Sequence, residues 1–506
     1  MTEVNLGIIL VEIITSGLYK NSLDVIREYI QNSCDAIDDA IKVGVLRKND
    51  GKITITIDEA KRKITIEDNG IGLSALTFQK KLSDIGKSDK TLETARGFRG
   101  IGRLGGMAYC KTLVFSSKIA GEKKISRLII DAERLRREFF SDKKRPAEYA
   151  LATNMSFSTS DTNSYNGHFF RVELIDIVYT NADLLNVNKV RDYLSFIAPV
   201  PYSPQFEFRK QIYAHATELG FKITEYDICV NGKPIFKSYK TDVQTTYNGD
   251  DKIFGVEFRK VYDDDENLIA WFWFGLSQFK GVLSEKHETD SYKMRGIRLR
   301  QKNIQIGDAL ILRTVFEDDQ RGTKYFIGEV HTIDTNLRPN SERDDFEENT
   351  AYNNLKSALK KYFVELNELY RTAVTVRTLI NAVNAPGNAV SDFQRGRSKF
   401  KNREELKDEL DRLNRNAIKA DSTLAWINWK ATRTPDTVSA KFINHVMENQ
   451  TPFVPPKLPP IDEPSLPFKW RKDSLKLYNA IKEVILANPT IGGRKLLDKI
   501  NDTLLK

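Results

Sequence analysis

The segment REYIQNSCDAIDDAI, residues 27–41, constrains the fold of this chain more than any other stretch. Its apolar residues recur at a helical period, which predicts a helix with one buried face; they are Tyr29, Ile30, Ala36, Ile37 and Ile41. Glu28, Asn32 and Asp35 follow one another at four and three residues, so all three project from one side of that helix. Two acids and an amide beside a buried stripe fit either a solvated polar edge or a functional site.

Composition places few limits on function. The 506 residues include 78 lysines and arginines against 69 acidic residues, a charge of +9 that permits contact with nucleic acid or acidic surfaces without requiring it. The three cysteines are far apart and form no C-x-x-C pair, which argues against disulfides and a zinc site and suits a reducing cytosol. The apolar opening contains Glu12 and is too short to span a bilayer. We therefore expect a core helix at about 7–18, no membrane segment and a cytoplasmic location.

Hydrophobic patterning divides the chain into five parts. They are a mixed helix-and-strand domain, a second α/β block, a helical region, a proline-rich linker and a small helical tail, at residues 1–180, 181–349, 350–450, 451–469 and 470–506. The first part contains a predicted hairpin, KITITID and KITIED, so we expect an α+β fold with helices on one face of a largely antiparallel sheet. A second hairpin, around CVNGKPIFK, is expected in the second block. In the helical region, a narrow apolar seam resembles a short coiled coil; its residues are Leu406, Leu410, Leu413 and Ala417.

Two further stretches carry chemistry. In IEDNGIGLS, Asp68 ends a strand pattern and precedes Gly70 and Gly72, which permit a sharp turn and close approach to a flat ligand. A carboxylate there can accept a hydrogen bond from an exocyclic amine, as on adenine, although a plain turn explains the same residues. The glycine-rich ARGFRGIGRLGG, residues 95–106, could cradle phosphates through its backbone amides or could be a flexible loop. It is not a P-loop, because no Gly-Lys-Ser/Thr closes it.

Taken in this order, the three stretches resemble the nucleotide-binding boxes of the GHKL superfamily of gyrase, heat-shock chaperone, histidine kinase and MutL. EYIQNSCDA matches every fixed position of E-x-x-x-N-x-x-D-A, DNGIG matches D-x-G-x-G, and GFRGIG matches the third box. The resemblance implies a GHKL (Bergerat) α/β sandwich that binds and hydrolyses ATP, followed by an α/β, transducer-like middle domain and a helical C-terminal region.

The resemblance also implies a role for each box residue. Glu28 would be the general base that orients water against the γ-phosphate, and Asn32 would give an oxygen to Mg²⁺. The other expected nucleotide-binding residues lie in the three boxes and just before the third; they are Asp35, Ala36, Asp68, Gly70, Gly72, Lys87, Gly97, Gly100, Ile101 and Gly102. The family's Gly-Thr near the adenine is replaced by Gly167-His168, so that role stays unassigned.

Within the superfamily, residues 1–350 are most similar to the ninety-kilodalton heat-shock chaperones, the HtpG-like branch. IGKSDKT resembles the stretch before their lid, so we expect residues 85–106 to close over the nucleotide, with Lys87 approaching the phosphates. IDTNLRPNSERDDF resembles their middle-domain loop, whose arginine reaches the γ-phosphate. That role would fall to Arg343, unless Arg343 belongs to a surface turn and pairs with a neighbouring aspartate.

Two function classes follow from this resemblance. The first is an ATP-hydrolysing clamp similar to a heat-shock chaperone, an ATP-dependent homodimer that acts on a protein client or partner subunit. The second is a DNA-binding clamp of MutL or MORC type, in repair, restriction or phage defence. A kinase is disfavoured, because Glu28 suits hydrolysis and the five histidines occur singly.

Two basic segments bear on the second class. In YKMRGIRLRQK, residues 292–302, the side chains of Arg298, Arg300 and Lys302 share one strand face. RGRSKFKNRE, residues 395–404, is also basic. Each segment could contact DNA or could be a solvated edge.

Overall fold

The computed structural model describes residues 21–83, 102–139, 147–163, 166–245, 249–281, 290–316, 320–340, 342–400, 403–458, 472–487 and 491–504. The chain divides into two compact units, Met1–Arg371 and Thr372–Lys506. The helix expected at about 7–18, much of the proline-rich linker and most of the expected lid lie outside the described residues.

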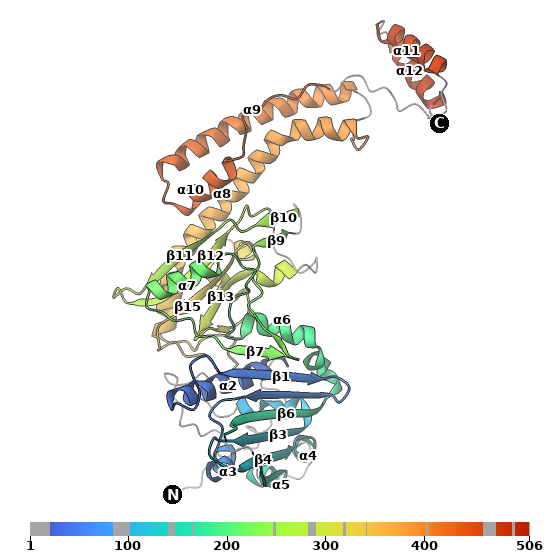
Figure 1. Ribbon diagram of the computed structural model, residues 1–506. Helices are drawn as coiled ribbons and strands as arrows, with labels where there is room; N and C mark the ends of the chain where they lie inside the picture. Colours follow the sequence, from blue (N-terminus) through green and yellow to red (C-terminus); the bar gives the residue numbers. More distant parts are fainter. Residues whose placement is uncertain are drawn as a thin grey trace. The chain divides into compact units, whose positions relative to one another are not determined.

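The first part of unit 1 is an eight-stranded sheet with helices on one face. Its elements are α2 (Asp24–Lys42), β1 (Lys52–Asp58), β2 (Lys63–Asp68), α3 (Ala75–Ser83), η1 (Gly102–Ala108), β3 (Cys110–Lys118), β4 (Lys124–Asp131), α4 (Ala132–Phe139), α5 (Ala147–Thr153), β5 (Met155–Asp161), β6 (Phe169–Ile177), η2 (Tyr179–Leu185), α6 (Val187–Ile197), β7 (Asp227–Val230) and β8 (Lys233–Pro234). The strand order is β5-β4-β3-β6-β2-β1-β7-β8, and the predicted hairpin is β1 and β2 (Figure 1).

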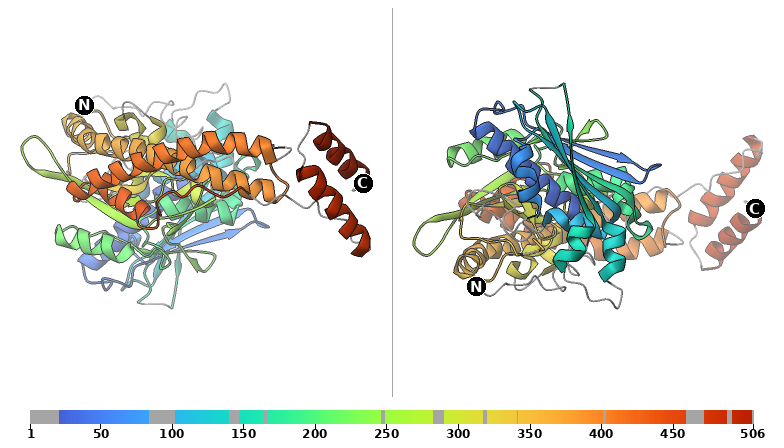
Figure 2. Two further views of the ribbon diagram at one scale, coloured as in Figure 1. Left: turned by 90° about the horizontal axis from the view of Figure 1, so that it is seen from above. Right: turned by 90° about the horizontal axis from the view of Figure 1, so that it is seen from below.

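Strand register explains why one face of this sheet is buried. Alternate residues of neighbouring strands stand opposite one another and form two apolar rows across the sheet; the rows are Ile57, Ile64, Leu174, Leu113 and Ile130, and Ile55, Ile66, Val172, Phe115 and Leu128. All ten residues belong to the core that α2 and η1 also enter. The opposite face carries ion pairs between strands, such as Lys63 with Glu173. Seen from below, the blue and teal helices lie along one side of the sheet, as the predicted α+β sandwich requires (Figure 2).

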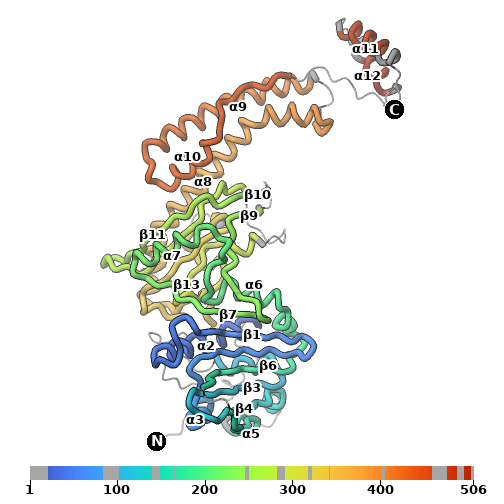
Figure 3. Tube along the Cα trace, viewed as in Figure 1, coloured from blue at the N-terminus to red at the C-terminus, as the bar shows by residue number. Residues whose placement is uncertain are grey.

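The sheet continues beyond residue 180, where the sequence patterns suggested a division. Strand β7, from the second predicted hairpin, pairs parallel with β1, with Ile53 opposite Ile228 and Ile55 opposite Val230 (Figure 3). Asn231 extends this pairing, because its side chain accepts a hydrogen bond from Ile57 N at 2.8 Å. The expected hairpin is present, but it belongs to the first sheet because it covers the otherwise open edge of β1.

The second sheet of unit 1 is packed on both faces. Its order is β11-β12-β15-β13-β14, and a two-stranded sheet of β9 and β10 stands apart from it. The elements of this part are α7 (Arg209–Glu218), β9 (Asp242–Thr245), β10 (Gly249–Lys252), β11 (Gly255–Tyr262), β12 (Leu268–Leu276), η4 (Asp290–Met294), β13 (Gly296–Gln301), β14 (Ile304–Ile306), η5 (Ile311–Phe316), η6 (Gln320–Lys324), β15 (Ile327–Thr332) and the start of α8 (Thr350–Gln394). The interior strand β12 directs its large rings alternately to the two faces of the sheet. Trp271 packs in the cluster that includes Ile212 of α7, and Phe272 packs against Phe363 of α8.

Unit 2 is helical, as expected. It contains the rest of α8, then α9 (Arg403–Arg433), α10 (Val438–Met447), α11 (Lys472–Ala487) and α12 (Ile491–Leu504). The expected seam on α9 is real. Leu406, Leu410 and Ala417 are buried and Leu413 is half-buried, and Leu406 and Leu410 pack with Val390 near the end of α8. Among the described helices, none is both long and apolar enough to cross a membrane.

The basic strand β13 fits neither interpretation offered for it, a DNA-contacting face or a solvated edge. Arg298 and Arg300 are 5% and 0% exposed. Arg298 donates to Gln305 Oε1 at 2.6 Å and its guanidinium lies 4.1 Å from the ring centroid of Phe196. Arg300 donates to the carbonyl of Phe196 at 2.8 Å. Both were wrongly expected to face solvent or DNA, because the alternation of the strand cannot show that α6 covers that face.

The partner of Arg300 is a carboxylate with no access to solvent. Glu329 of β15 lies 2.5 Å from Arg300 Nε and 2.8 Å from Lys237 Nζ, and all three side chains are fully buried. Tyr202 and Tyr239 donate their hydroxyls to the same carboxylate at 2.5 and 3.0 Å. Burial opposes the charged form, yet Arg300 and Lys237 hold the pKa of Glu329 well below its ordinary value. Burial, reinforced by Arg300, lowers the pKa of Lys237 to about 7.

We predict that Glu329→Gln destabilises unit 1 strongly. The substitution leaves Arg300 and Lys237 buried without their counterion, which typically costs about 3–5 kcal/mol. Urea unfolding followed by fluorescence measures the loss. Asp183→Asn, which breaks an exposed pair with Lys189, should leave the midpoint close to that of wild type. Equal shifts in the two variants would contradict a special role for the buried carboxylate.

Candidate functional site

Helix α2 holds the first box with its acids buried. Glu28 and Asp35 are 7% and 4% exposed, and Asn32 is half-buried. Carboxylates are rarely removed from water unless they are paired. The polar side of this helix is therefore not a solvated edge, and the elements that cover it define the candidate site.

The end of the glycine-rich segment covers part of the polar side of α2. Helix η1 is fixed to α2 by Tyr29, whose hydroxyl donates to the carbonyl of Arg103 at 3.0 Å and accepts from Gly106 N at 3.1 Å. At Gly102, an added Cβ would stand 2.4 Å from Glu28 Oε2. The third box thus reaches the carboxylate of the first, and glycine at position 102 permits the approach. The sequence pattern placed Tyr29 only in the apolar stripe and missed this anchoring role.

The other cover is the loop that contains Arg343. Arg343 Nε donates to Glu28 Oε1 at 3.1 Å, although the two residues are 315 positions apart in the chain. Both side chains are about one-tenth exposed. Beside them, Arg27 Nη2 donates to the carbonyl of Glu342 at 2.8 Å. Arg343 is therefore a buried partner of the first box.

The backbone of this loop is held in a turn that most residues avoid. Arg343 has a φ of 55°, in the left-handed region. Its N–H donates to the carbonyl of Asn340 at 3.2 Å, and its own carbonyl accepts from Gly307 N at 3.0 Å. The side chain of Asn340 donates to Asp344 at 2.6 Å. Such a conformation persists only where its surroundings fix it, and it aims the guanidinium at Glu28.

The second box closes against the middle of α2. Asp68, 2% exposed, accepts from the hydroxyl of Ser33 at 2.7 Å and from Gly70 N at 2.9 Å. Ile71 N donates to the carbonyl of Ala36 at 3.0 Å. A Cβ on Gly70 would stand 2.6 Å from both the backbone and the side chain of Ala36. The small residues at 36 and 70 therefore let the two boxes meet.

Gly72 and His168 connect the second box to residues of the first sheet and its loops. Gly72 has a φ of +70°, and an added Cβ would lie 2.2 Å from the carbonyl oxygen of Lys118. The Nδ1 atom of His168 lies 2.9 Å from the carbonyl oxygen of Gly70. His168, left unassigned by the sequence, thus contacts the second box from the start of β6. Which residue takes the place of the family threonine stays open.

Two side-chain amides of α2 have no hydrogen-bond partner among the described residues. Within the described residues, Asn32 makes no hydrogen bond through its side chain, which leaves its carboxamide oxygen for a hard cation such as Mg²⁺. Gln31 is fully buried, and among the described residues neither polar atom of its amide has a partner. A buried amide without a hydrogen-bond partner costs free energy, and no sequence pattern indicates this one. With the carboxylates of Glu28 and Asp68, these residues fit ATP and a magnesium ion.

Four expected nucleotide-binding residues lie outside the described part of the chain. They are Lys87, Gly97, Gly100 and Ile101. Their contact with nucleotide and the closing of the lid stay predictions.

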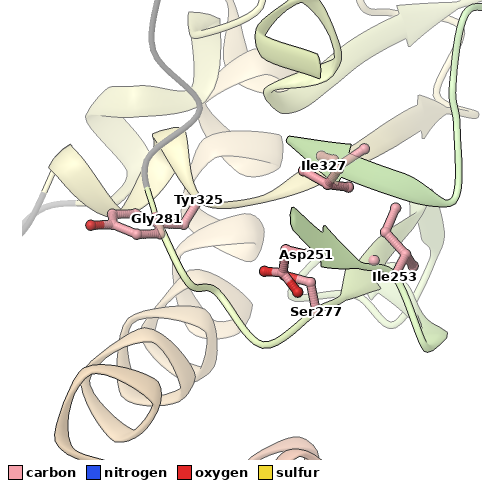
Figure 4. A pocket seen from close by; sticks show the side chains of 8 residues that line it. Asp251, Ile253, Ser277, Gly281, Tyr325 and Ile327 are labelled. Atoms are coloured by element: carbon pink, nitrogen blue, oxygen red, sulfur yellow. The ribbon is translucent and has the colours of Figure 1, made fainter. Parts of the chain in front are cut away.

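The hollow drawn in Figure 4 lies in the second part of unit 1 and is separate from the candidate site on α2. It has an empty volume of about 290 Å³, partly open to solvent, and is lined by Val243, Asp251, Ile253, Gly275, Ser277, Gly281, Tyr325 and Ile327. Its one carboxylate, Asp251, accepts from the backbone N–H groups of Lys252, Gln278 and Lys280 at 2.8 to 3.1 Å. Asp251 therefore fixes local loops, and the hollow shares no residue with the site on α2.

Comparison with known families agrees with this site. Residues 19–162 match the family model described as "Histidine kinase-, DNA gyrase B-, and HSP90-like ATPase". The matched range contains all three boxes and most of the first sheet. This part of the chain is an ATPase domain of the GHKL superfamily, which confirms the resemblance drawn from the boxes.

Within that superfamily, the matched segment is similar to the chaperone protein HtpG. It is 32% identical over 133 residues to the chaperone protein HtpG of Helicobacter hepaticus, covering 23% of this chain and 22% of that protein. It is 33% identical over 131 residues to HtpG of Psychrobacter cryohalolentis, covering 22% and 20%. The match to HtpG of Coxiella burnetii is 40% over 85 residues, covering 16% and 13%. The chain thus spans about a fifth of the length of the first two relatives.

We predict that Gly70→Ala destabilises the protein and Gly255→Ala does not. The new methyl group at position 70 would meet the backbone of Ala36, whereas nothing lies within 4 Å of a Cβ at position 255. Overpacking of this kind typically costs about 1–3 kcal/mol. Thermal unfolding of both variants measures the difference. If both variants lose the same amount of thermal stability, the close approach of the two boxes does not contribute to the free energy of unfolding.

Proposed function

We propose that the protein is an ATP-binding and ATP-hydrolysing molecular clamp, similar to a heat-shock-type chaperone, in which the second part of unit 1 senses the nucleotide bound to the first. The buried ion pair between Glu28 and Arg343 carries this proposal, because it joins the first box directly to the loop at residue 343. The matched ATPase family and the chaperone relatives support the same conclusion.

Each residue of the site then has one task. Glu28 accepts the proton of the water that attacks the γ-phosphate. Asp68 accepts a hydrogen bond from the adenine amine, and Asn32 offers an oxygen to Mg²⁺. The bound ion would neutralise charge on the phosphate oxygens. Asp35, Ala36 and the glycines of the boxes shape the site, and Arg343 stabilises the charge on the γ-phosphate.

The ion pair also implies an order of events. While Arg343 holds Glu28, its guanidinium occupies one oxygen of the carboxylate and is not free for phosphate. A γ-phosphate carries more negative charge than a carboxylate and competes for the arginine. Transfer of Arg343 from Glu28 to the phosphate would release the base and stabilise the transition state in one movement. Nucleotide binding is in this way coupled to the position of the loop.

The partners belong to the same proposal. A clamp of this kind would act on a protein client or a partner subunit, as an ATP-dependent homodimer in the cytoplasm, and the similarity to HtpG chaperones supports a chaperone-like role. A MutL- or MORC-type DNA clamp is the alternative. Burial takes Arg298 and Arg300 of the segment 292–302 away from DNA but leaves Lys293, Arg295 and Lys302 half-buried. The turn after α8 keeps Arg395, Arg397 and Lys399 exposed.

We predict that Glu28→Gln and Asp68→Asn fail in different ways. Loss of the base should lower phosphate release on the order of a hundredfold or more while Mg-ATP still binds. Loss of the Asp68 carboxylate should weaken binding itself. Calorimetry beside a phosphate-release assay separates the two effects. The assignment does not survive if both variants lose binding equally. Glu28→Ala, which also removes the side-chain volume, should lose turnover in the same way.

We predict that Arg343→Ala reduces hydrolysis but leaves ADP affinity unchanged, because ADP lacks the γ-phosphate. Arg343→Lys should restore hydrolysis only in part, since an ammonium cannot reproduce the guanidinium fork. Arg338→Ala is the control, because Arg338 lies in the same loop but is exposed. Full-length variants are needed, because a fragment ending at residue 180 would lose β7 and part of the core. Wild-type turnover in Arg343→Ala would refute the sensing role.

A further inference from the structure

The outward face of helix α9 combines exposed aromatic rings with cations. Trp426 and Trp429 are 57% and 51% exposed, and Ile418 is 53% exposed. Large rings are among the side chains that gain most from burial, so two exposed tryptophans one turn apart are a surface feature that needs an explanation.

Helical spacing places these rings opposite the packed side of α9. The buried residues of the helix recur at three, four and seven positions; they are Leu410, Ala417, Ala420, Leu424 and Ala431. At 100° per residue, Trp426 and Trp429 fall on the far side of the helix from this seam. The seam supplies the apolar side chains through which α9 packs against its neighbouring helices. The two tryptophans are therefore not part of that core.

Over residues 412–433 the same face carries positive charge and no negative charge, whereas the exposed Asp408 and Asp411 lie on it nearer the start of α9. Arg415, Lys419, Lys430 and Arg433 are all exposed and lie within about 60° of the line through the tryptophans. The one acid between residues 412 and 433 is Asp421, which is half-buried and lies toward the flank of the helix. We call residues 415–433 of this face the basic–aromatic stripe. With a rise of 1.5 Å per residue it is about 27 Å long.

Cations and rings in the stripe are paired. The ammonium of Lys430 lies 5.7 Å from the centroid of Trp426, and the guanidinium of Arg433 lies 4.1 Å from the centroid of Trp429. The turn before α9 repeats the arrangement, with the ammonium of Lys399 at 5.2 Å from the ring of Phe400. Each pair sets a positive group beside a flat π surface, and these are the two features that a nucleotide strand recognises.

We propose that the basic–aromatic stripe binds single-stranded nucleic acid. The cations follow the phosphates of the strand, and the exposed faces of the two tryptophans stack on unpaired bases. Duplex DNA would contact the cations through its phosphates, but its base faces are already stacked on one another. The tryptophans would then have no base on which to stack. An anionic membrane surface would need a broad apolar face. On this helix the apolar residues of that face are separated by charged and hydroxyl side chains such as Lys419 and Ser422.

The inference stands apart from the ATPase proposal, because it uses only residues of unit 2. It is tested with the full chain and a fluorescently labelled 20-nucleotide oligothymidine, by anisotropy at several salt concentrations. Trp426→Ala with Trp429→Ala should weaken binding roughly tenfold or more with little change in salt dependence. Trp426→Phe with Trp429→Phe should retain most of the affinity, because a phenyl ring still stacks.

A charge variant tests the other half of the stripe. Lys430→Gln with Arg433→Gln should reduce the slope of log affinity against log salt by about 1.4, roughly 0.7 for each lost phosphate contact. Lys476→Gln with Lys495→Gln removes the same charge from exposed positions of α11 and α12 and should change the slope little. Circular dichroism and ATP binding confirm that each variant is folded.

Three results would overturn the inference. The first is wild-type affinity for the oligonucleotide in both the tryptophan and the charge variants. The second is equal binding of a duplex of the same length, insensitive to the tryptophans, which would leave a phosphate-only surface. The third is absence of oligonucleotide binding at low salt, whether or not vesicles of phosphatidylserine and phosphatidylcholine bind through the same residues.

Discussion

The ion pair between Glu28 and Arg343 is the contact on which the organisation of unit 1 depends. It brings together a carboxylate from helix α2 and a guanidinium 315 residues later. The surrounding geometry serves this contact. Gly102 leaves room beside the carboxylate, Arg27 binds the backbone next to Arg343, and the left-handed φ of Arg343 turns its side chain inward. Two parts of unit 1 with separate sheets thereby share one site.

A buried ion pair is a poor source of stability but a good element for a switch. Removing both charges from water costs free energy, and this cost offsets most of the gain from their attraction. The net contribution of the pair to stability is therefore small. A competing anion can therefore shift it with modest binding energy. The cluster around Glu329 has the opposite character. Two cations and two hydroxyls surround one carboxylate without access to solvent, so this group holds the second sheet against α6.

The sequence predicted the parts of the site that depend on local spacing. The helix with Glu28, the turn after Asp68 and the hairpin of β1 and β2 follow from periodicity and glycine placement, and the three boxes together indicated the superfamily. Burial and long-range pairing were not accessible in this way. Arg300 looks like a surface residue on an alternating strand, and only the packing of α6 shows otherwise. The anchoring by Tyr29, the contact of His168 and the orphaned amide of Gln31 arise from tertiary contacts that no local pattern encodes.

The pairing of β1 with β7 has a consequence for synthesis of the chain. The residues that join there, such as Ile57 and Asn231, are 174 positions apart. At about 5–20 residues per second, the ribosome needs roughly 9 to 35 s to deliver the second after the first. During that interval β1 is an exposed edge strand next to a nearly finished sheet, which is a known route to aggregation. The nascent domain is thus most vulnerable just before β7 emerges, and any slowing of translation between these strands prolongs that state.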